Sequence, residues 1–413
     1  MKIRLFMAIV LLPILTFASA LPEPALPASV GVNIHFIRGH EHELDMIAAA
    51  GFKFVRMDFD WTTTEPTKGG YDWSAYDELT TNLSRRGIRA YYILDYSNPL
   101  YENESPTHPA GIAAFARWAA AAARHFQSQR VVWEIWNEPN GSTFWKPKPD
   151  AAQYTALALA ACKAIRKADS QATIVAPASY GFDWPFLETF LNSGVLAYLD
   201  GVSVHPYRSP EKYPETVATD YQRLHELIAR CEPAGRKIPI ISGEWGYPSN
   251  TKGVSLQTQS DFIARQQLFN LFSGVPVSIW YDWGNDGKNP DDKEHNFGTV
   301  TYDLKPKPAY VAIQTLTREL SGYSISGRYD TGNQADFALV LTNAEGAVKM
   351  AAWTLSKPHR VTLGLESASM KKLSWINGNN ESGTVEIEEN NFTSELNGTP
   401  KYITLGKVHL KHN

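Results

Sequence analysis

The chain has 413 residues, of which 43% are hydrophobic and 20% are charged. This composition supports a large core and excludes wholesale disorder, and the length suits a barrel with an accessory domain. The 39 Lys and Arg residues against 43 Asp and Glu give a net charge of −4, and no basic stripe is present, so we expect no nucleic-acid partner. Two cysteines, Cys162 and Cys231, are too few for a disulfide scaffold, a zinc cluster or an iron–sulfur site; the sequence leaves open whether they pair.

Residues 1–20 have the features of a cleaved signal peptide. Lys2 precedes an apolar run at 5–17, and Ala18-Ser19-Ala20 matches a small-x-small cleavage site. The apolar run is shorter than the roughly 20 residues that a membrane-spanning helix needs. We therefore predict cleavage after Ala20, export to the periplasm or the extracellular medium of a bacterium, and no membrane span in the mature chain.

Strand and helix patterns alternate regularly between residues 30 and 322. The apolar, β-branched-rich runs that we predict as strands are residues 30–36, 52–61, 88–96, 131–137, 172–178, 201–207, 238–245 and 275–283. Stretches with apolar residues three and four positions apart lie between them and predict helices. Eight strands, each followed by a helix, indicate an α/β protein whose residues 21–322 form a (β/α)8 TIM barrel. A doubly wound sheet would carry a glycine-rich phosphate turn after an early strand, and the sequence has none.

The helical period is lost in residues 323–413. Short strands are predicted there at residues 337–341, 348–353, 360–363, 373–376, 384–387 and 401–405. Turns rich in Asn, Gly, Ser and Glu separate them, which is typical of an antiparallel β-sandwich. We expect this C-terminal domain to pack on the barrel as structural support.

Polar residues are predicted at the carboxyl ends of the barrel strands, where the active site of a TIM barrel lies. They are His35, Arg56, Asp58, Asp95, Asn137, Glu138, Ser179, His205, Tyr207, Glu244, Trp280 and Asp282. Glu138 and Glu244 end strands four and seven, and glycoside hydrolysis needs such a carboxylate pair, one protonated and one ionised. Each glutamate alone could be a turn residue, but the joint placement favours an active site.

The motifs around these glutamates resemble a known group of enzymes. Trp-Asn-Glu-Pro-Asn at 136–140, His-Pro-Tyr at 205–207 and Gly-Glu-Trp-Gly at 243–246 resemble the retaining glycoside hydrolases of clan A. Within the clan, the stretches at 31–36, 93–101, 144–150 and 242–247 are similar to family 39-like enzymes, the PslG-type endoglycosidases of bacterial exopolysaccharide. The resemblance covers the barrel and extends to about residue 402.

The resemblance implies a role for each matching residue. Glu138 would be the acid/base and Glu244 the nucleophile of a double displacement, which needs no metal and no organic cofactor. Asn137 would bind the hydroxyl beside the reacting carbon. Tyr207 and Arg56 would hold Glu244 in its ionised form.

Further residues are expected around the sugar. His205 would face the acid/base, and Trp280 would form the floor of the sugar site. The polar loop at 285–295 would shape the cleft. The remaining expected substrate contacts come from His35, Asp95, Trp145 and Trp184.

We interpret the chain as an exported, monomeric endo-β-glycosidase that trims a polysaccharide or oligosaccharide, with bacterial exopolysaccharide as the favoured substrate. Alternatives of the same clan are an exo-acting β-xylosidase and an endoglucanase on plant polymer. A polysaccharide-binding protein that lost catalysis and a metal-dependent hydrolase on the same barrel also stay open. An open groove lined with aromatic rings favours endo action, and a blind pocket favours exo action.

Overall fold

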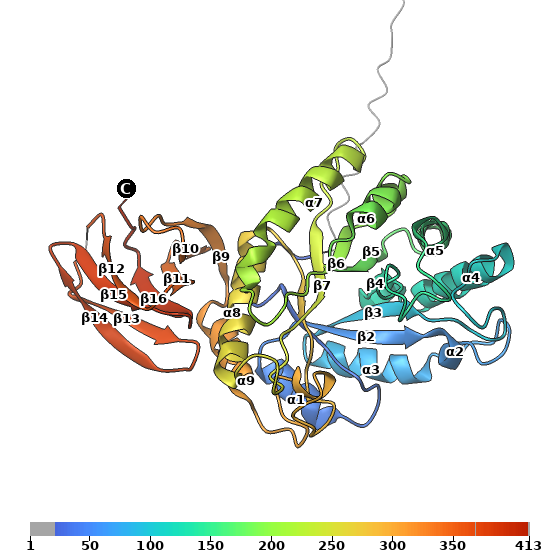
Figure 1. Cartoon of the computed structure of the whole chain (residues 1–413), viewed down its shortest axis with the longest axis horizontal. Coiled ribbons are helices and arrows are strands. Elements are labelled where there is room, and N and C mark those ends of the chain that lie inside the picture. Colours follow the sequence, from blue (N-terminus) through green and yellow to red (C-terminus); the bar gives the residue numbers. More distant parts are fainter. Residues whose placement is uncertain (1–20, 368, 412–413) are drawn as a thin grey trace, which may run out of the picture.

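The computed structural model describes residues 21–367 and 369–411, so the expected signal peptide lies outside the described residues. Figure 1 shows two units side by side, a barrel and a β-domain, with the chain passing once from the first to the second. Both units match the predicted fold class.

Eight parallel strands close into a barrel in chain order, and β1 pairs with β8. The strands are β1 (Val30–Asn33), β2 (Phe54–Asp60), β3 (Arg89–Asp95), β4 (Val132–Ile135), β5 (Thr173–Tyr180), β6 (Gly201–His205), β7 (Ile240–Trp245) and β8 (Ser278–Trp280). All eight predicted strands are confirmed. Several end earlier than the apolar runs do, because the last residues of those runs turn into the loops that form the site.

Helices surround the barrel. They are α1 (Glu41–Ala49), α2 (Trp61–Thr64), α3 (Ser74–Arg85), α4 (Pro109–His125), α5 (Ala151–Ala168), α6 (Trp184–Leu191), α7 (Ala218–Cys231), α8 (Leu256–Phe272) and α9 (Pro308–Glu319). Side-chain caps begin several of them: Asp150 accepts hydrogen bonds from two backbone N–H groups of α5, and Ser255 accepts one from α8. Helix α8 is buried on nearly all sides, and its polar Gln266 donates to the backbone oxygen of Trp245 (3.2 Å), so the helix also fixes the end of β7.

The C-terminal unit is one antiparallel sheet of eight strands in the order β12-β15-β14-β13-β16-β11-β10-β9. Its strands are β9 (Tyr323–Arg328), β10 (Asp336–Asn343), β11 (Val348–Thr354), β12 (His359–Gly364), β13 (Lys372–Asn377), β14 (Ser382–Glu388), β15 (Asn391–Leu396) and β16 (Lys401–Gly406). The predicted antiparallel C-terminal β-domain is confirmed, and its eight strands are consistent with a β-sandwich-like fold. The six predicted strands are present, and β9 and β15 were missed because both alternate polar and apolar residues over short stretches rich in Ser, Thr and Asn.

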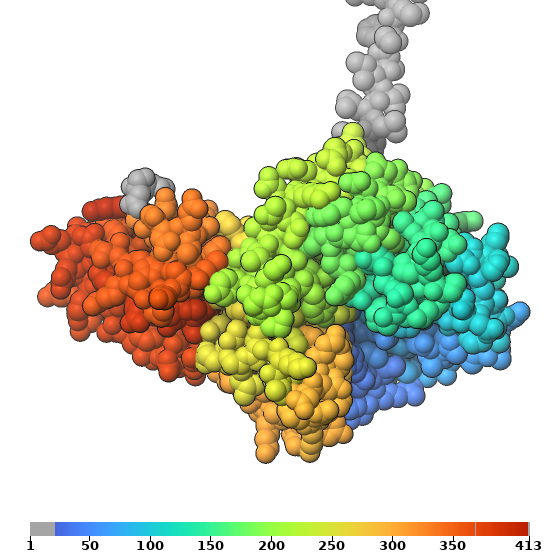
Figure 2. Space-filling model, in the orientation of Figure 1, coloured from blue at the N-terminus to red at the C-terminus, as the bar shows by residue number. Residues whose placement is uncertain are grey.

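The two units share a buried interface along α8 (Figures 1 and 2). Arg265 of α8 donates two hydrogen bonds to Glu215, at 2.8 and 2.7 Å, and Trp353 of β11 donates a third at 2.7 Å. All three side chains are buried. The β-domain therefore holds the segment after β6, which contributes to the candidate site.

Two further expectations concern the whole chain. Cys162 in α5 and Cys231 at the end of α7 are free thiols. In residues 21–367 and 369–411, no helix has both the length and the apolar character needed to cross a bilayer.

Candidate active site

A cavity of about 1010 Å³ opens at the carboxyl ends of the barrel strands. Both Glu138 and Glu244 line it. Another hollow, of about 500 Å³, lies at the amino-terminal ends of the strands, and among the described residues it is lined by no carboxylate. The chemistry therefore belongs to the first cavity, as the general rule for TIM barrels leads one to expect.

Glu138 lies in the loop that follows β4. Trp136 and Glu138 both have positive φ angles, 67° and 44°, a conformation that costs non-glycine residues about 1–3 kcal/mol each. Two hydrogen bonds stabilise this conformation: the N–H of Trp136 donates to the backbone oxygen of Leu94 (3.1 Å), and that of Glu138 donates to the backbone oxygen of Ala178 (3.0 Å). The turn directs the Glu138 carboxylate toward His205, whose Nδ1 lies 2.8 Å from Oε1. Strain in the loop thus coincides with the placement of a reactive side chain.

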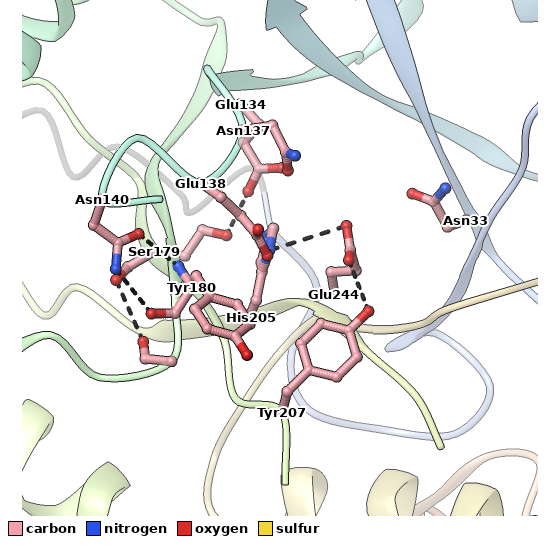
Figure 3. A network of polar contacts seen from close by, with 12 residues as sticks. Asn33, Glu134, Asn137, Glu138, Asn140, Ser179, Tyr180, His205, Tyr207 and Glu244 are labelled. Carbon is pink, nitrogen blue, oxygen red and sulfur yellow. Dashed lines mark hydrogen bonds and ion pairs between the residues drawn. The ribbon is translucent and has the colours of Figure 1, made fainter. Parts of the chain in front are cut away.

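Glu244 lies on β7, opposite Glu138 (Figure 3). Its Oε2 accepts a hydrogen bond from Arg56 (2.6 Å), and its Oε1 accepts one from the Tyr207 hydroxyl (2.7 Å). Burial alone would raise the pKa of Glu244, but the charges of His205 and Arg56 and these two hydrogen bonds outweigh burial and lower it. Glu244 is therefore held as a carboxylate.

Arg56 connects Glu244 to a carboxylate inside the barrel. Its Nε donates to Glu134 (2.8 Å), while its other nitrogens donate to Asn33 (3.1 Å) and Asn137 (2.9 Å). Glu134 is fully buried and also accepts hydrogen bonds from the hydroxyls of Tyr91 and Ser203. Neither Glu134 nor Asn33 was predicted from the sequence; the signal for Glu134 was a charged residue in the middle of an otherwise apolar strand.

The two glutamates are close enough to act on one sugar. One carboxylate oxygen of each, together with a nitrogen of His205, lies within 4.8 Å of the others. Retaining glycosidases have carboxyl groups about 5–5.5 Å apart, whereas inverting ones need about 6.5–9.5 Å. The same three residues offer donors for a cation, but Arg56 and Tyr207 already occupy both oxygens of Glu244. The arrangement suits acid–base and nucleophilic chemistry better than metal ligation.

The structure corrects two predicted roles at the strand ends. Trp280 is fully buried and does not line the cavity; the neighbouring Tyr281 does. Asp95 is also fully buried, beside Asp58, and does not line the cavity. Burial, followed by the charge of Asp58, raises the pKa of Asp95 well above its usual range. Neither side chain is therefore exposed to the cavity.

The two tryptophans expected in the cleft, Trp145 and Trp184, do not line the cavity. Trp145 is fully buried between Trp136 and Tyr154. Trp184 is partly buried, and the guanidinium of Arg223 lies 3.9 Å from its ring centre. The aromatic residues that do line the cavity are Phe144, Tyr180, Tyr207, Tyr281 and Phe297.

His35 lies beside the main cavity, in a hollow of about 440 Å³. Its Nδ1 is 2.9 Å from Asp286 and 3.8 Å from Asp282, and its ring centre is 5.5 Å from that of Tyr281. Although burial opposes the change, the hydrogen bond to Asp286 and the charges of both aspartates raise the pKa of His35 to about 9. The loop at 285–295 supplies Asp291, Lys293 and Glu294 to the main cavity wall, as predicted.

Comparison with known proteins places this geometry in context. The model of a family described as Cellulase (glycosyl hydrolase family 5) matches residues 27–287. The manganese dependent endoglucanase Eg5A of Phanerodontia chrysosporium is 22% identical over 254 residues, which make up 56% of this chain and 62% of that protein. The alignment thus spans less than two thirds of the relative's length.

Solved structures share the fold. A family 39 glycoside hydrolase from the gut symbiont Bacteroides cellulosilyticus WH2 is 23% identical, with a TM-score of 0.82 over 92% of this chain and 81% of that one. A monomeric beta-xylosidase from Caulobacter crescentus CB15 is 16% identical, with a TM-score of 0.69 over 93% of this chain and 97% of that one. Both likenesses extend across the barrel and the β-domain.

Proposed function

Because the chain belongs to the cellulase family, glycosyl hydrolase family 5, we propose that it is a retaining endo-β-glycosidase that hydrolyses a polysaccharide. Membership also confirms the clan predicted from the sequence, and family 39 structures share the fold. The observation that carries the proposal is the pair Glu138 and Glu244, since one carboxylate oxygen of each lies within 4.8 Å of the other across one cavity.

In the first step, Glu244 attacks the anomeric carbon while Glu138 gives its proton to the glycosidic oxygen. The C–O bond to the leaving sugar breaks, and an ester between Glu244 and the remaining sugar forms. Arg56 and Tyr207 support this step because they keep Glu244 ionised in the free enzyme. In the second step, Glu138 takes a proton from water, whose oxygen attacks the same carbon and releases the sugar with retained configuration.

His205 orients the acid/base. Its Nε2 is 3.3 Å from a nitrogen of Arg56, and arginine can only donate, so a ring proton is assigned to Nδ1, the nitrogen that faces Glu138. That Nδ1–H donates to Oε1 of Glu138, 2.8 Å away. The proton for the leaving group then belongs on Oε2, which is left to face the substrate.

Three features support endo action on an exported polymer. The cavity is large and lined by rings from several loops, which suits more than one sugar residue. The signal-peptide features of residues 1–20 agree with a substrate outside the cytoplasm. The resemblance to exopolysaccharide endoglycosidases favours bacterial matrix polysaccharide. A second candidate substrate is a glucan, because the family name and the Phanerodontia chrysosporium relative both refer to glucan hydrolysis.

Site-directed variants test the proposed roles on activated aryl β-glycosides. Glu244→Gln is expected to abolish turnover, and Glu138→Gln to accumulate the glycosyl-enzyme because its hydrolysis lacks a base. A 2-deoxy-2-fluoro glycoside should label Glu244, which peptide mass spectrometry would identify. Glu294→Gln is a matched control, since Glu294 lines the same cavity and lies outside the proposed pair. Wild-type activity in Glu244→Gln, or a label on another residue, would refute the assignment.

Substrate class needs a separate experiment. The mature protein is incubated with a panel of bacterial exopolysaccharides and plant glycans, and the products are sized by mass spectrometry. Endo action predicts a ladder of oligosaccharides from the first minutes. Release of single sugars alone would favour the exo-acting alternative.

A further inference from the structure

We propose that Tyr180 is a stacking platform for the sugar on the leaving-group side of the cleaved bond. This assignment rests on the proposed function and goes beyond it by locating a binding subsite. Tyr180 is 56% exposed and lines the cavity that contains both glutamates. An exposed aromatic ring in a polar cleft offers an apolar surface that matches the C–H face of a pyranose.

The backbone of Tyr180 is fixed to the acid/base loop. The side chain of Asn140, two positions after Glu138, donates to the backbone oxygen of Tyr180 (2.9 Å) and accepts from its N–H (2.8 Å). The next N–H, of Gly181, donates to the backbone oxygen of His205 (3.0 Å). The ring and the proton donor are therefore held in one frame, which is what a subsite that aligns a leaving group requires.

The position of Tyr180 identifies which sugar it contacts. Glu138 must reach the glycosidic oxygen, which lies between the reacting sugar and the leaving group. In Figure 3, Asn140 and the backbone of Tyr180 lie on the opposite side of Glu138 from Glu244, and the Tyr180 ring extends from there below Glu138, with its centre 6.4 Å from that of Tyr207. Tyr281 and the hollow around His35 lie on the side of β8 and β1, so the reacting sugar and its non-reducing neighbours belong there. The ring of Tyr180 is left for the leaving-group sugar.

The fold itself does not account for the exposed ring. Within the described residues, the Tyr180 hydroxyl has no hydrogen bond, and its ring lies near that of Tyr207, at 6.4 Å between centres. A structural tyrosine normally buries its ring and bonds its hydroxyl, as Tyr154 does with the backbone oxygen of Ile135. Tyr180 does neither, so a ligand is the better explanation for its placement.

An acceptor experiment tests the platform separately from the reaction. The full mature chain is trapped as its 2-fluoroglycosyl ester, excess reagent is removed, and recovery of activity is followed in buffer alone and with cellobiose or xylobiose. The acceptor occupies the leaving-group side and speeds recovery by transglycosylation. Tyr180→Ala is expected to recover normally in buffer and to need about tenfold more acceptor for the same acceleration. Tyr180→Phe, which keeps the ring, should behave like the wild type.

Tyr302→Ala is the matched control, because Tyr302 is 55% exposed but lines the hollow around His35. Its acceptor response should be unchanged. Equal acceptor responses in Tyr180→Ala and the wild type would overturn the platform. An equal loss in Tyr302→Ala would overturn it as well. If the wild-type chain forms no ester at all, the proposed function fails instead, so the two failures are distinguishable.

Discussion

Replacing Tyr207 by Phe removes one of the two hydrogen bonds to Glu244 and leaves the ring in place. The bond joins the Tyr207 hydroxyl to Oε1 at 2.7 Å, and the acceptor is ionised. Hydrogen bonds to charged groups contribute about 1.5–3 kcal/mol, which corresponds to roughly a 10- to 150-fold change in an equilibrium or rate. We expect kcat/KM on an aryl glycoside to fall within this range, because the nucleophile loses part of its orientation.

The pH profile gives the sharper test. The Tyr207 hydroxyl is among the groups that lower the pKa of Glu244, so its removal must raise that pKa. The acidic limb of the kcat/KM profile, which reports ionisation of Glu244 in the free enzyme, should move to higher pH in Tyr207→Phe. Tyr213→Phe is the control, since Tyr213 is in the same loop but packs on Arg265. An unmoved acidic limb, or an equal shift in Tyr213→Phe, would show that Tyr207 does not hold the nucleophile.

Three further predictions concern stability. Glu215→Gln leaves the buried guanidinium of Arg265 without its counter-charge and should lower the free energy of unfolding by about 3–5 kcal/mol in chemical denaturation. Glu188→Gln is the control, because Glu188 belongs to an exposed pair, and it should change the free energy of unfolding by less than about 0.5 kcal/mol. Trp280→Ala should lower the free energy of unfolding by about 3–5 kcal/mol because it opens a cavity in the core. Tyr281→Ala should reduce activity more than stability. A larger loss of activity in Trp280→Ala than in Tyr281→Ala would instead support Trp280 as the floor of the site. The raised pKa of His35, about 9 against 6.5 in the unfolded chain, adds stability that is complete below about pH 6.5 and disappears as the pH rises through about 9. The stability difference between wild type and His35→Gln should shrink over that interval, and a difference that grows would contradict the ion pair.

The sequence predicted the barrel because its signals repeat. Eight apolar runs at regular spacing remain recognisable even when the ends of single strands are misjudged. The pair Glu138 and Glu244 was found for the same reason, since Glu138 follows β4, Glu244 lies near the end of β7, and parallel strands bring their carboxyl ends together. The exact residues at which the strands end were predicted less accurately. Strand β8 stops at Trp280, and side chains alternate along a strand, so an error of one position exchanged a core residue for Tyr281.

The aromatic lining could not be predicted from residue type. Trp145 and Trp184 follow the strands that carry Glu138 and Tyr180, yet both pack against other side chains. Burial of a large ring stabilises the fold wherever space exists, and nothing in a local pattern separates such a ring from one that faces a cleft. Tyr180 was not predicted, because its backbone is positioned by the side chain of Asn140, which lies in the loop after another strand.

Glu134 keeps the buried Arg56 paired with a carboxylate when the charge of Glu244 changes. Arg56 bonds both Glu134 and Glu244, so two carboxylates share one buried cation in the free enzyme. In the proposed mechanism Glu244 forms an ester with the sugar and loses its charge, which would leave Arg56 unpaired if Glu244 were its sole partner. An unpaired buried charge is strongly unfavourable, whereas Arg56 keeps the bond to Glu134 at 2.8 Å. Glu134 would thus lower the electrostatic penalty of the proposed covalent intermediate, although its side chain lies outside the cavity.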